Sequence, residues 1–508
     1  MMIRSTCRPA LEGRLFGTVA CRDTTPFCYP VYTRMVAQAT RTSWKHYIHN
    51  SSPTENSLLT SSSAPSTTSS SDSRTIRPLE QQMSATAPNA LEKLPLSQIL
   101  RTYFMTSISS SPILLGASTS ILQQMLESNS LFFSIERNPV LRTLLWETFY
   151  KQFCAGENAT QVQKTCSGLR QQGYGVILEY ALELLKDAEG DESKDVEIWK
   201  KGMLETVSMA AEGDFVGLKW SGMGSAAMQR LRANEEPSER MEEAMNSLCQ
   251  AAAEKNVSLL PAAEETWSLE GVNNWSLRLQ RLYNVHGKSV VYNTYQAYLR
   301  QMPRILAQHL SVAKEEGFTL GVKLVRGAYL GSEDRGMIWP SIEKTHETYD
   351  SLAEALIHRR YNDTLQQLPS SASTSWSARH GDYELWPDIN VVLATHNATS
   401  VAKAQSLRKA QAACGEILTP LVFAQLQGMA DEVSCSLIAS SKAAELDGNG
   451  VKEKVYKCTT WGSMFECLNY LLRRAAENKD AAGRTSETRS AMMKELRKRM
   501  KSLIGFNQ

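Results

Sequence analysis

The chain has 508 residues, of which 42% are hydrophobic and 21% are charged, with a formal net charge of +2. This composition is that of an ordinary globular protein with one large core, and its balanced charge argues against nucleic-acid binding. No apolar run reaches the roughly eighteen residues of a membrane span, so no transmembrane helix is expected. Ten cysteines without a C-x-x-C pair or a metal-like spacing to histidine predict reduced intracellular thiols and no metal site.

The first fifty residues differ in composition from the rest of the chain. This segment contains seven arginine and lysine residues but only two acidic ones, Glu12 and Asp23. Hydroxyl residues are interleaved among them, and there is no continuous apolar core. This pattern predicts a mitochondrial transit peptide over residues 1–50, with a disordered basic tail as the alternative. Residues 51–90 are rich in serine and threonine, which cannot supply a core, so we expect a disordered linker.

Apolar residues recur at helical spacing from Leu91 onward, and we expect a helical arm over residues 91–170. From Gly173 short apolar runs alternate with longer helical ones. Candidate strands are residues 174–178, 215–220, 257–260, 290–295, 319–325, 389–394 and 420–426, and helical stretches include 196–212, 241–255, 300–316 and 341–359. Repeated β-then-α units predict an α/β protein with a parallel sheet, closed as a (βα)8-type barrel over residues 171–480. Residues 369–388 interrupt one unit and are interpreted as a surface insertion.

Unusual polar residues stand at the ends of several predicted strands, where such barrels place their reactive side chains. Lys219 lies in an apolar run, where an unpaired buried ammonium is costly, so it either is paired at a site or extends its amine to solvent. Lys323 and Arg326 need an anionic partner, which can be a ligand or a buried carboxylate. Other strand ends carry Gln296, Tyr329, Thr395, His396 and Leu426.

The last barrel element, residues 464–478, is predicted to be one helix. Tyr470 lies one turn before Arg473 and Arg474, and Glu477 lies one turn after them, so the four side chains share an edge. Two adjacent guanidiniums repel each other unless an anion lies between them. Glu477 can neutralise one, and a ligand carboxylate suits the other through bidentate hydrogen bonds. A solvated basic face is the alternative.

A glycine string offers a competing motif. Gly222-Met-Gly224-Ser-Ala-Ala227 is similar to G-x-G-x-x-A of dinucleotide-binding proteins. That fingerprint requires an acid about 20 residues on, at the end of the next strand. The next candidate strand ends near Leu260, much later, so we interpret the match as coincidence; an NAD-dependent dehydrogenase would rest on this string alone.

Four strings in order carry a resemblance to a known family: Val322-Lys-Leu-Val-Arg-Gly-Ala-Tyr-Leu, Ala394-Thr-His-Asn, Gln425-Leu-Gln-Gly-Met and Tyr470-Leu-Leu-Arg-Arg-Ala-Ala-Glu-Asn. With Lys219 they span about 260 residues and resemble the proline dehydrogenase family, specifically its mitochondrial, fungal-type members. The resemblance implies a distorted, TIM-like (βα)8 barrel that binds FAD, with its last helix above the mouth. It further implies oxidation of L-proline to Δ1-pyrroline-5-carboxylate, with electrons passed to ubiquinone on the matrix side of the inner mitochondrial membrane.

The resemblance also implies roles for individual residues. Positions that match the family's substrate pocket are Lys219, Tyr329, Leu426, Tyr470, Arg473 and Arg474, with catalytic roles at Lys219, Tyr470, Arg473 and Arg474. Positions that match its FAD site are Gln296, Lys323, Arg326, Gly327, Ala328, Thr395, His396, Arg474 and Glu477. Glu183 matches a gate glutamate that pairs with one arginine.

Two positions depart from the family pattern. Ala262 stands where the family has an aspartate, and Cys458, four residues before Gly462, stands where it has a tyrosine that limits access by hydroxylated proline. Both changes imply a larger and less polar pocket. A paralogue that oxidises 4-hydroxyproline or another proline derivative therefore stays open, as do a weakened proline enzyme and a catalytically silent carboxylate-binding protein.

The carboxyl tail, residues 481–508, is basic and amphipathic. Met492, Leu496 and Met500 recur at helical spacing beside Lys494 and Arg497. A basic amphipathic helix suits an anionic membrane surface, so peripheral contact with the inner mitochondrial membrane is one hypothesis. Packing of this helix against the barrel is the alternative.

Overall fold

The structure, a computed structural model, describes residues 90–128, 130, 132–135, 137–181, 190–368, 386–447, 450–477 and 482–503. The predicted transit peptide, nearly all of the predicted linker and Glu183 lie outside these ranges. Most of the predicted insertion, residues 369–385, also lies outside them.

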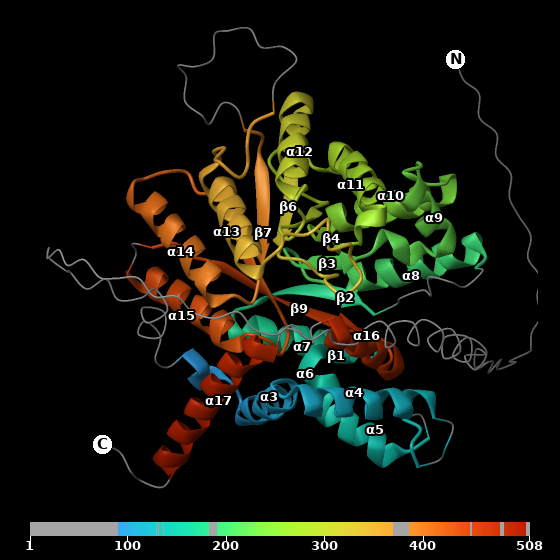
Figure 1. The fold of residues 1–508 in the computed structure, drawn as a ribbon, viewed down its shortest axis with the longest axis vertical. Coiled ribbons are helices and arrows are strands. Elements are labelled where there is room, and N and C mark those ends of the chain that lie inside the picture. Colours follow the sequence, from blue (N-terminus) through green and yellow to red (C-terminus); the bar gives the residue numbers. More distant parts are fainter. Residues whose placement is uncertain are drawn as a thin grey trace, which may run out of the picture. The chain divides into compact units, whose positions relative to one another are not determined.

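Eight parallel strands form a nearly closed barrel (Figure 1). They are β2 (Gly175–Tyr180), β3 (Phe215–Leu218), β4 (Ser258–Pro261), β5 (Asn293–Gln296), β6 (Leu320–Val325), β7 (Ile389–Ala394), β8 (Leu421–Leu426) and β9 (Lys454–Trp461). The hydrogen-bonded order is β4-β3-β2-β9-β8-β7-β6-β5, and a parallel bridge between Leu259 and Val291 joins the two ends. The predicted (βα)8 barrel is therefore confirmed.

Helices follow the strands on the outside of the barrel (Figure 1). They are α8 (Glu192–Met209), α9 (Ser225–Ala233), α10 (Glu239–Glu254), α11 (Leu269–Tyr283), α12 (Met302–Glu316), α13 (Ile342–His358), α14 (Ala398–Ala413), α15 (Asp431–Asp447) and α16 (Met464–Glu477), with short 3-10 turns η3 (Trp220–Met223) and η4 (Thr266–Ser268). Their ends follow local chemistry. Ser341 and Asn397 accept backbone N–H bonds at the starts of α13 and α14, and left-handed Gly317 ends α12.

The interior of the barrel changes from apolar to polar along the strands. Inward-facing Ile177, Phe215, Leu260, Tyr292 and Val392 pack together and fill the lower part. Because side chains of a strand alternate between its faces, the next inward positions lie two residues further on. At the end of β2 this position is Glu179, two residues after Ile177, and Lys219 stands four residues after Phe215, directly past the end of β3, so charged groups gather at the mouth.

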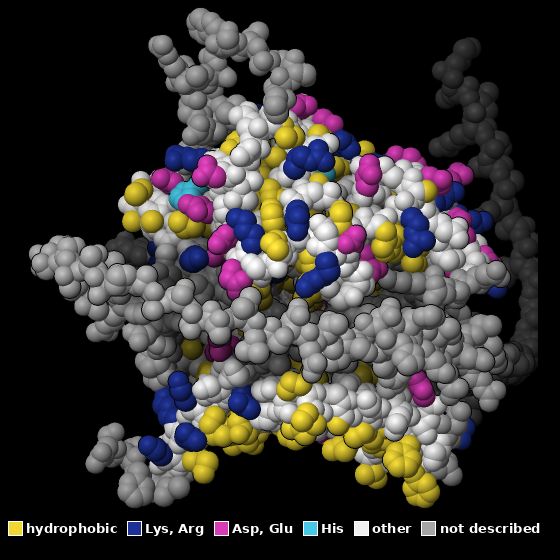
Figure 2. Space-filling view, viewed as in Figure 1, with side chains coloured by type: hydrophobic (Ala, Val, Ile, Leu, Met, Phe, Trp, Pro, Cys, Tyr) yellow, Lys and Arg dark blue, Asp and Glu magenta, His cyan; other side chains and the backbone are white. Residues whose placement is uncertain are grey.

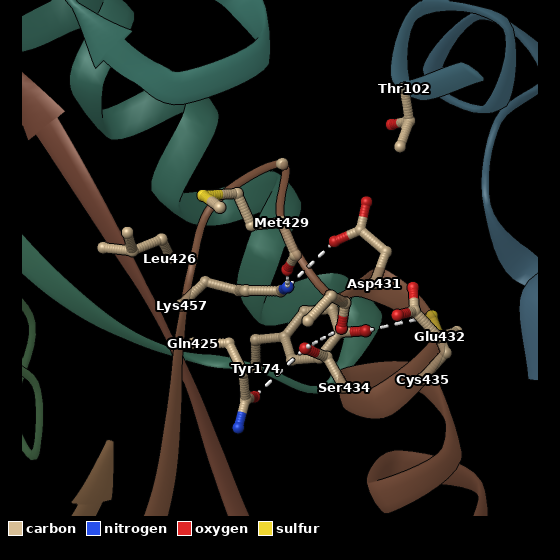
Figure 3. A network of polar contacts seen from close by, with 12 residues as sticks. Thr102, Tyr174, Gln425, Leu426, Met429, Asp431, Glu432, Ser434, Cys435 and Lys457 are labelled. Carbon is tan, nitrogen blue, oxygen red and sulfur yellow. Dashed lines mark hydrogen bonds and ion pairs between the residues drawn. The ribbon is translucent and has the colours of Figure 1, made fainter. Parts of the chain in front are cut away.

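Strand β9 was missing from the predicted strands, because Lys457 interrupts its apolar pattern. The Lys457 and Asp431 side chains are only 3% and 2% exposed, and their charged atoms lie 2.8 Å apart. The Lys457 ammonium also donates to the Met429 carbonyl at 3.0 Å (Figure 3). Asp431 also accepts from Gln98 Nε2 at 3.2 Å. A lysine can occupy this buried strand because Asp431 compensates its charge.

Helices also occupy the range of the predicted arm. They are η1 (Ala90–Lys93), α3 (Leu96–Ser109), α4 (Pro112–Glu127), α5 (Pro139–Leu145), the π-helical turn η2 (Trp146–Tyr150), α6 (Lys151–Phe153) and α7 (Ala159–Gln172). A short strand that was not predicted, β1 (Cys154–Gly156), pairs with β9. Gln152 Nε2 donates to the Gly428 carbonyl at 2.9 Å, and the Tyr150 hydroxyl donates to the Gly462 carbonyl at 2.7 Å. Since these glycines follow β8 and β9, the arm is attached at the carboxyl side of the barrel.

The carboxyl tail forms helix α17 (Ala482–Leu503), which packs against α3. Met492 is fully buried against Leu94, Ile99 and Cys435, and Leu496 packs beside it. This part of the predicted apolar stripe is therefore used for packing, the alternative to membrane contact. None of the helices in the described ranges combines the length and hydropathy needed to cross a bilayer.

Candidate active site

Lys219 and Tyr329, 110 residues apart in sequence, meet at the mouth of the barrel. Lys219 directly follows β3, and its ammonium donates to the Tyr329 hydroxyl at 2.9 Å and lies 3.9 Å from the Glu264 carboxylate. The Tyr329 hydroxyl in turn donates to the Ala263 carbonyl at 2.8 Å. The Lys219 side chain is only 23% exposed, so Lys219 is paired within a site and does not extend its amine into solvent.

The turn that carries Tyr329 is fixed by a buried glutamine at the end of β5. Gln296 Nε2 donates to the Glu264 carbonyl at 2.9 Å, and Gln296 Oε1 accepts from the Ala328 N–H at 3.1 Å. Gly327 lets this turn approach β5, because a Cβ there would lie 2.5 Å from the Tyr298 ring. Gln296, Gly327 and Ala328 thus hold the loops after β4 and β6 together.

Arg326, directly after β6, donates to three neutral side chains. Its guanidinium donates to the Thr395 and Ser400 hydroxyls at 2.5 and 2.6 Å and to His346 Nδ1 at 3.0 Å. It also stacks 4.2 Å above the centre of the Tyr349 ring. These contacts orient a cation at the carboxyl ends of β6 and β7.

Two further predicted residues join the ends of β7 and β8. His396 Nε2 accepts from the Leu426 N–H at 3.1 Å. A neutral imidazole with Nε2 as acceptor carries its proton on Nδ1. Lys323 lies on β6, in register with Thr294 of β5 and Val392 of β7, where its side chain is half-buried.

Glu179, which we did not predict, faces Tyr470 of α16 across the mouth. The Tyr470 hydroxyl donates to Glu179 Oε2 at 3.3 Å, and Cys458 Sγ lies 3.9 Å from the same oxygen. Burial first, and then the Glu179 charge, raises the pKa of the Cys458 thiol, while Lys323 acts in the opposite direction. Cys458 is therefore a neutral thiol. The signal for Glu179 was present in the sequence, because a carboxylate two residues after inward-facing Ile177 must face the same interior.

Helix α16 begins with a reciprocal cap, in which Ser463 and Glu466 bond each other's backbone N–H groups. Arg473, Arg474 and Glu477 lie on this helix after Tyr470, but their side chains are outside the described part of the structure. Their predicted contacts with substrate and cofactor therefore stay predictions.

The competing glycine string has a packing role instead. A Cβ at Gly222 would lie 3.0 Å from Trp199, and one at Gly224 would lie 2.4 Å from the Asp195 carboxylate. Both glycines belong to the close approach of η3 to α8. Among the described residues, no group of His, Cys, Asp and Glu side chains is arranged to hold a metal ion.

Comparison with known proteins identifies the family. The family model described as proline dehydrogenase matches residues 162–487. A protein of Schizosaccharomyces pombe named probable proline dehydrogenase, mitochondrial, is 28% identical over 468 residues, which are 81% of this chain and 90% of that protein. A mouse protein named hydroxyproline dehydrogenase is 29% identical over 410 residues, 70% of this chain and 83% of that protein.

Solved structures share the fold. Proline utilization A of Bdellovibrio bacteriovorus has a TM-score of 0.57 at 14% identity, covering 79% of this chain and 41% of that one. A proline utilization A mutant of Bradyrhizobium japonicum has a TM-score of 0.53 at 16% identity, covering 92% of this chain and 47% of that one. The chain thus corresponds to less than half the length of these proteins.

Proposed function

This chain belongs to the proline dehydrogenase family, and we propose that it catalyses the FAD-dependent oxidation of L-proline to Δ1-pyrroline-5-carboxylate in the mitochondrion. The proposal includes ubiquinone as the electron acceptor, on the matrix side of the inner membrane. The observation that supports it is the cluster of polar side chains at the barrel mouth, where Lys219 contacts Tyr329 and Glu264. These residues come from three strand ends within the matched region.

The residues at the carboxyl ends of β5–β8 fit a flavin nucleotide. Anionic phosphates and the carbonyl-rich flavin ring need hydrogen-bond donors and positive charge. Lys323 and Arg326 supply the charge, Thr395 and His396 supply a hydroxyl and an imidazole, and buried Gln296 has a second amide hydrogen beyond the one it donates to Glu264. We assign the FAD site to these residues, with Gly327, Ala328, Arg474 and Glu477 beside them.

The reaction converts a ring C–N bond to C=N, which removes a hydride from carbon and a proton from nitrogen. FAD, when bound, supplies the hydride acceptor. The chain's own task is to hold the substrate, for which Arg473 and Arg474 provide a bidentate grip on its carboxylate. Lys219 and Tyr329 form the polar wall, and Tyr470 and Leu426 enclose the ring. A proton released beside Lys219 meets the carboxylate of Glu264.

A hydroxylated or bulkier proline is the second candidate substrate, and the surroundings of Cys458 favour it. Cysteine offers less volume than tyrosine, and Ala262 adds no polar group. The Glu179 carboxylate, 3.3 Å from the Tyr470 hydroxyl, provides a strong acceptor for a substrate hydroxyl on this wall. Similarity to the mouse protein named hydroxyproline dehydrogenase points the same way.

Dye-linked turnover of the purified protein against a panel of cyclic amino acids tests the proposal. We expect a yellow protein that oxidises proline or 4-hydroxyproline, with Arg473→Lys raising KM while retaining flavin, because lysine cannot reproduce the bidentate fork. Arg474→Met should also release flavin. The pair Ala262→Asp with Cys458→Tyr should shift preference toward proline, by about 1–3 kcal/mol. Protein that stays colourless with FAD and turns over none of the panel would instead be a silent carboxylate binder.

A further inference from the structure

The outer face of the helical arm is apolar, although it is exposed. Among the described residues, ten of the eighteen large apolar side chains that are exposed belong to residues 96–144. They are Leu96, Leu100, Phe104, Ile113, Leu114, Ile121, Phe132, Phe133, Val140 and Leu144. Figure 2 shows hydrophobic side chains gathered along the edge formed by α3, α4 and α5. We call this surface the arm face.

The arm face follows helical periodicity, so it is not a scatter of single side chains. On α3, Leu96, Leu100 and Phe104 recur every four residues on the outside, while Ile99 and Met105 are buried on the inside. On α5, Val140 and Leu144 are likewise one turn apart. A surface helix ordinarily has a polar outer face. Two apolar faces on one helix indicate that the outer one also has an apolar partner.

A basic surface adjoins the arm face. Helix α17 packs on α3 through Met492, and its residues Lys494, Arg497 and Lys501 are exposed. Arg499 ties the two elements together, because it donates to the carbonyls of Leu91, Glu92 and Leu94 at 2.9–3.1 Å, just before α3 begins. Lysine and arginine side chains lie beside the apolar edge in Figure 2.

The helical arm is attached beside the barrel mouth, so the arm face lies near the entrance to the candidate site. Gln152 and Tyr150 bond the loops after β8 and β9, and α4 packs against α16, the helix that carries Tyr470. A binding partner that docks on the arm face therefore lies beside the entrance to the candidate site.

We propose that the arm face, with the basic side of α17, docks on an anionic lipid bilayer. Apolar side chains insert at the acyl boundary, and cations meet the lipid headgroups. A lipid bilayer is the partner that fits, because an apolar face with a cationic border matches the acyl chains and the anionic headgroups of one surface. The inference deepens the proposed function and rests on it for one consequence: docking brings the barrel mouth to the membrane in which a quinone acceptor dissolves.

Vesicle sedimentation of the flavin-loaded protein tests the proposal. Vesicles are made of phosphatidylcholine alone or of phosphatidylcholine mixed with an equal amount of phosphatidylglycerol. The arm variant combines Ile113→Asp, Phe132→Asp and Val140→Asp, at side chains that are 83%, 79% and 77% exposed. The control combines Ile342→Asp, Ile417→Asp and Leu446→Asp, exposed apolar residues of the barrel helices and loops. A third variant, Lys494→Glu with Arg497→Glu and Lys501→Glu, reverses the basic border.

The parent and the control should bind the mixed vesicles, and the arm variant should bind at least about tenfold more weakly, because charged side chains cannot enter the acyl boundary. The charge-reversal variant should lose the preference for phosphatidylglycerol. All variants should keep dye-linked turnover in solution, and the arm variant alone should lose turnover with quinone dissolved in the vesicles. This dye assay separates failure of the proposed function from failure of docking.

Two results would overturn the docking proposal. One is a parent that stays in the supernatant with both kinds of vesicle. The other is a parent that sediments in the ultracentrifuge as an oligomer, which the arm variant converts to monomer, since the arm face would then contact a second copy of this chain.

Discussion

Replacement of Lys457 by methionine should be among the most damaging single changes in the barrel, although Lys457 is outside the predicted pocket. Methionine keeps much of the length of the side chain but removes the charge. The Asp431 carboxylate, 2% exposed, would lose the ammonium at 2.8 Å and keep Gln98 as a donor at 3.2 Å. The Met429 carbonyl would lose its donor at 3.0 Å (Figure 3).

The magnitude follows from this burial. Removing one partner of a buried ion pair leaves an uncompensated charge and costs about 3–5 kcal/mol. Lys457→Met combined with Asp431→Leu removes both charges, and it should recover most of that loss because apolar residues of similar volume can replace a buried pair. Lys454→Met, an exposed lysine on the same strand, serves as the control and should change stability by roughly 0.5 kcal/mol or less.

Urea unfolding followed by tryptophan fluorescence measures the free energy of unfolding for the four proteins. The order of stability should be parent and control first, the double variant next and Lys457→Met last. If Lys457→Met lost less than about 1 kcal/mol, or if the double variant were as unstable as the single one, the buried pair would not be what stabilises β9.

Three further predictions concern single side chains. Burial lowers the pKa of His309 to about 4, against about 6.5 when unfolded, so the unfolded state binds more protons between these values. Stability should therefore fall by up to about 3 kcal/mol as the pH drops through this window, and His309→Leu should flatten the slope in pH-dependent melting. Gly327→Ala should lower bound flavin and cost about 1–3 kcal/mol through its clash with Tyr298, whereas Gly116→Ala, with open space around it, should not destabilise. Glu179→Gln should lower kcat/KM for 4-hydroxyproline relative to proline by roughly tenfold, and an equal effect on both substrates would contradict its assignment to the hydroxyl wall.

Much of the barrel could be predicted because its strands are apolar runs between helices. The strand at residues 389–394 matches β7 residue for residue, and its neighbours differ at their ends. Strand β9 could not be found in this way, since Lys457 owes its burial to Asp431 and to the Met429 carbonyl, which lie elsewhere in the chain. A pattern within one segment does not contain the partner that compensates a charge.

The candidate site could also be predicted only in part. Polar residues at strand ends indicated the mouth, because parallel strands end at one edge of a barrel. Their pairing, such as Lys219 with Tyr329 and Tyr470 with Glu179, depends on the register of strands that are far apart in sequence. The carboxyl tail could not be interpreted from its sequence alone, because its amphipathic pattern fits packing and membrane contact equally well. The position of α3 against Met492 shows that the apolar side of this helix is used for packing, and contact of its basic side with a membrane stays a prediction.

The most direct test of the central claim is the kcat/KM for proline and 4-hydroxyproline of the parent and of Lys219→Met, measured with an artificial electron acceptor at equal flavin content. The ammonium of Lys219 lies 2.9 Å from the Tyr329 hydroxyl and 3.9 Å from Glu264, so its removal should leave flavin in place and reduce kcat/KM by about a hundredfold or more. A Lys219→Met protein as active as the parent would contradict the assignment of this barrel mouth as the site of oxidation.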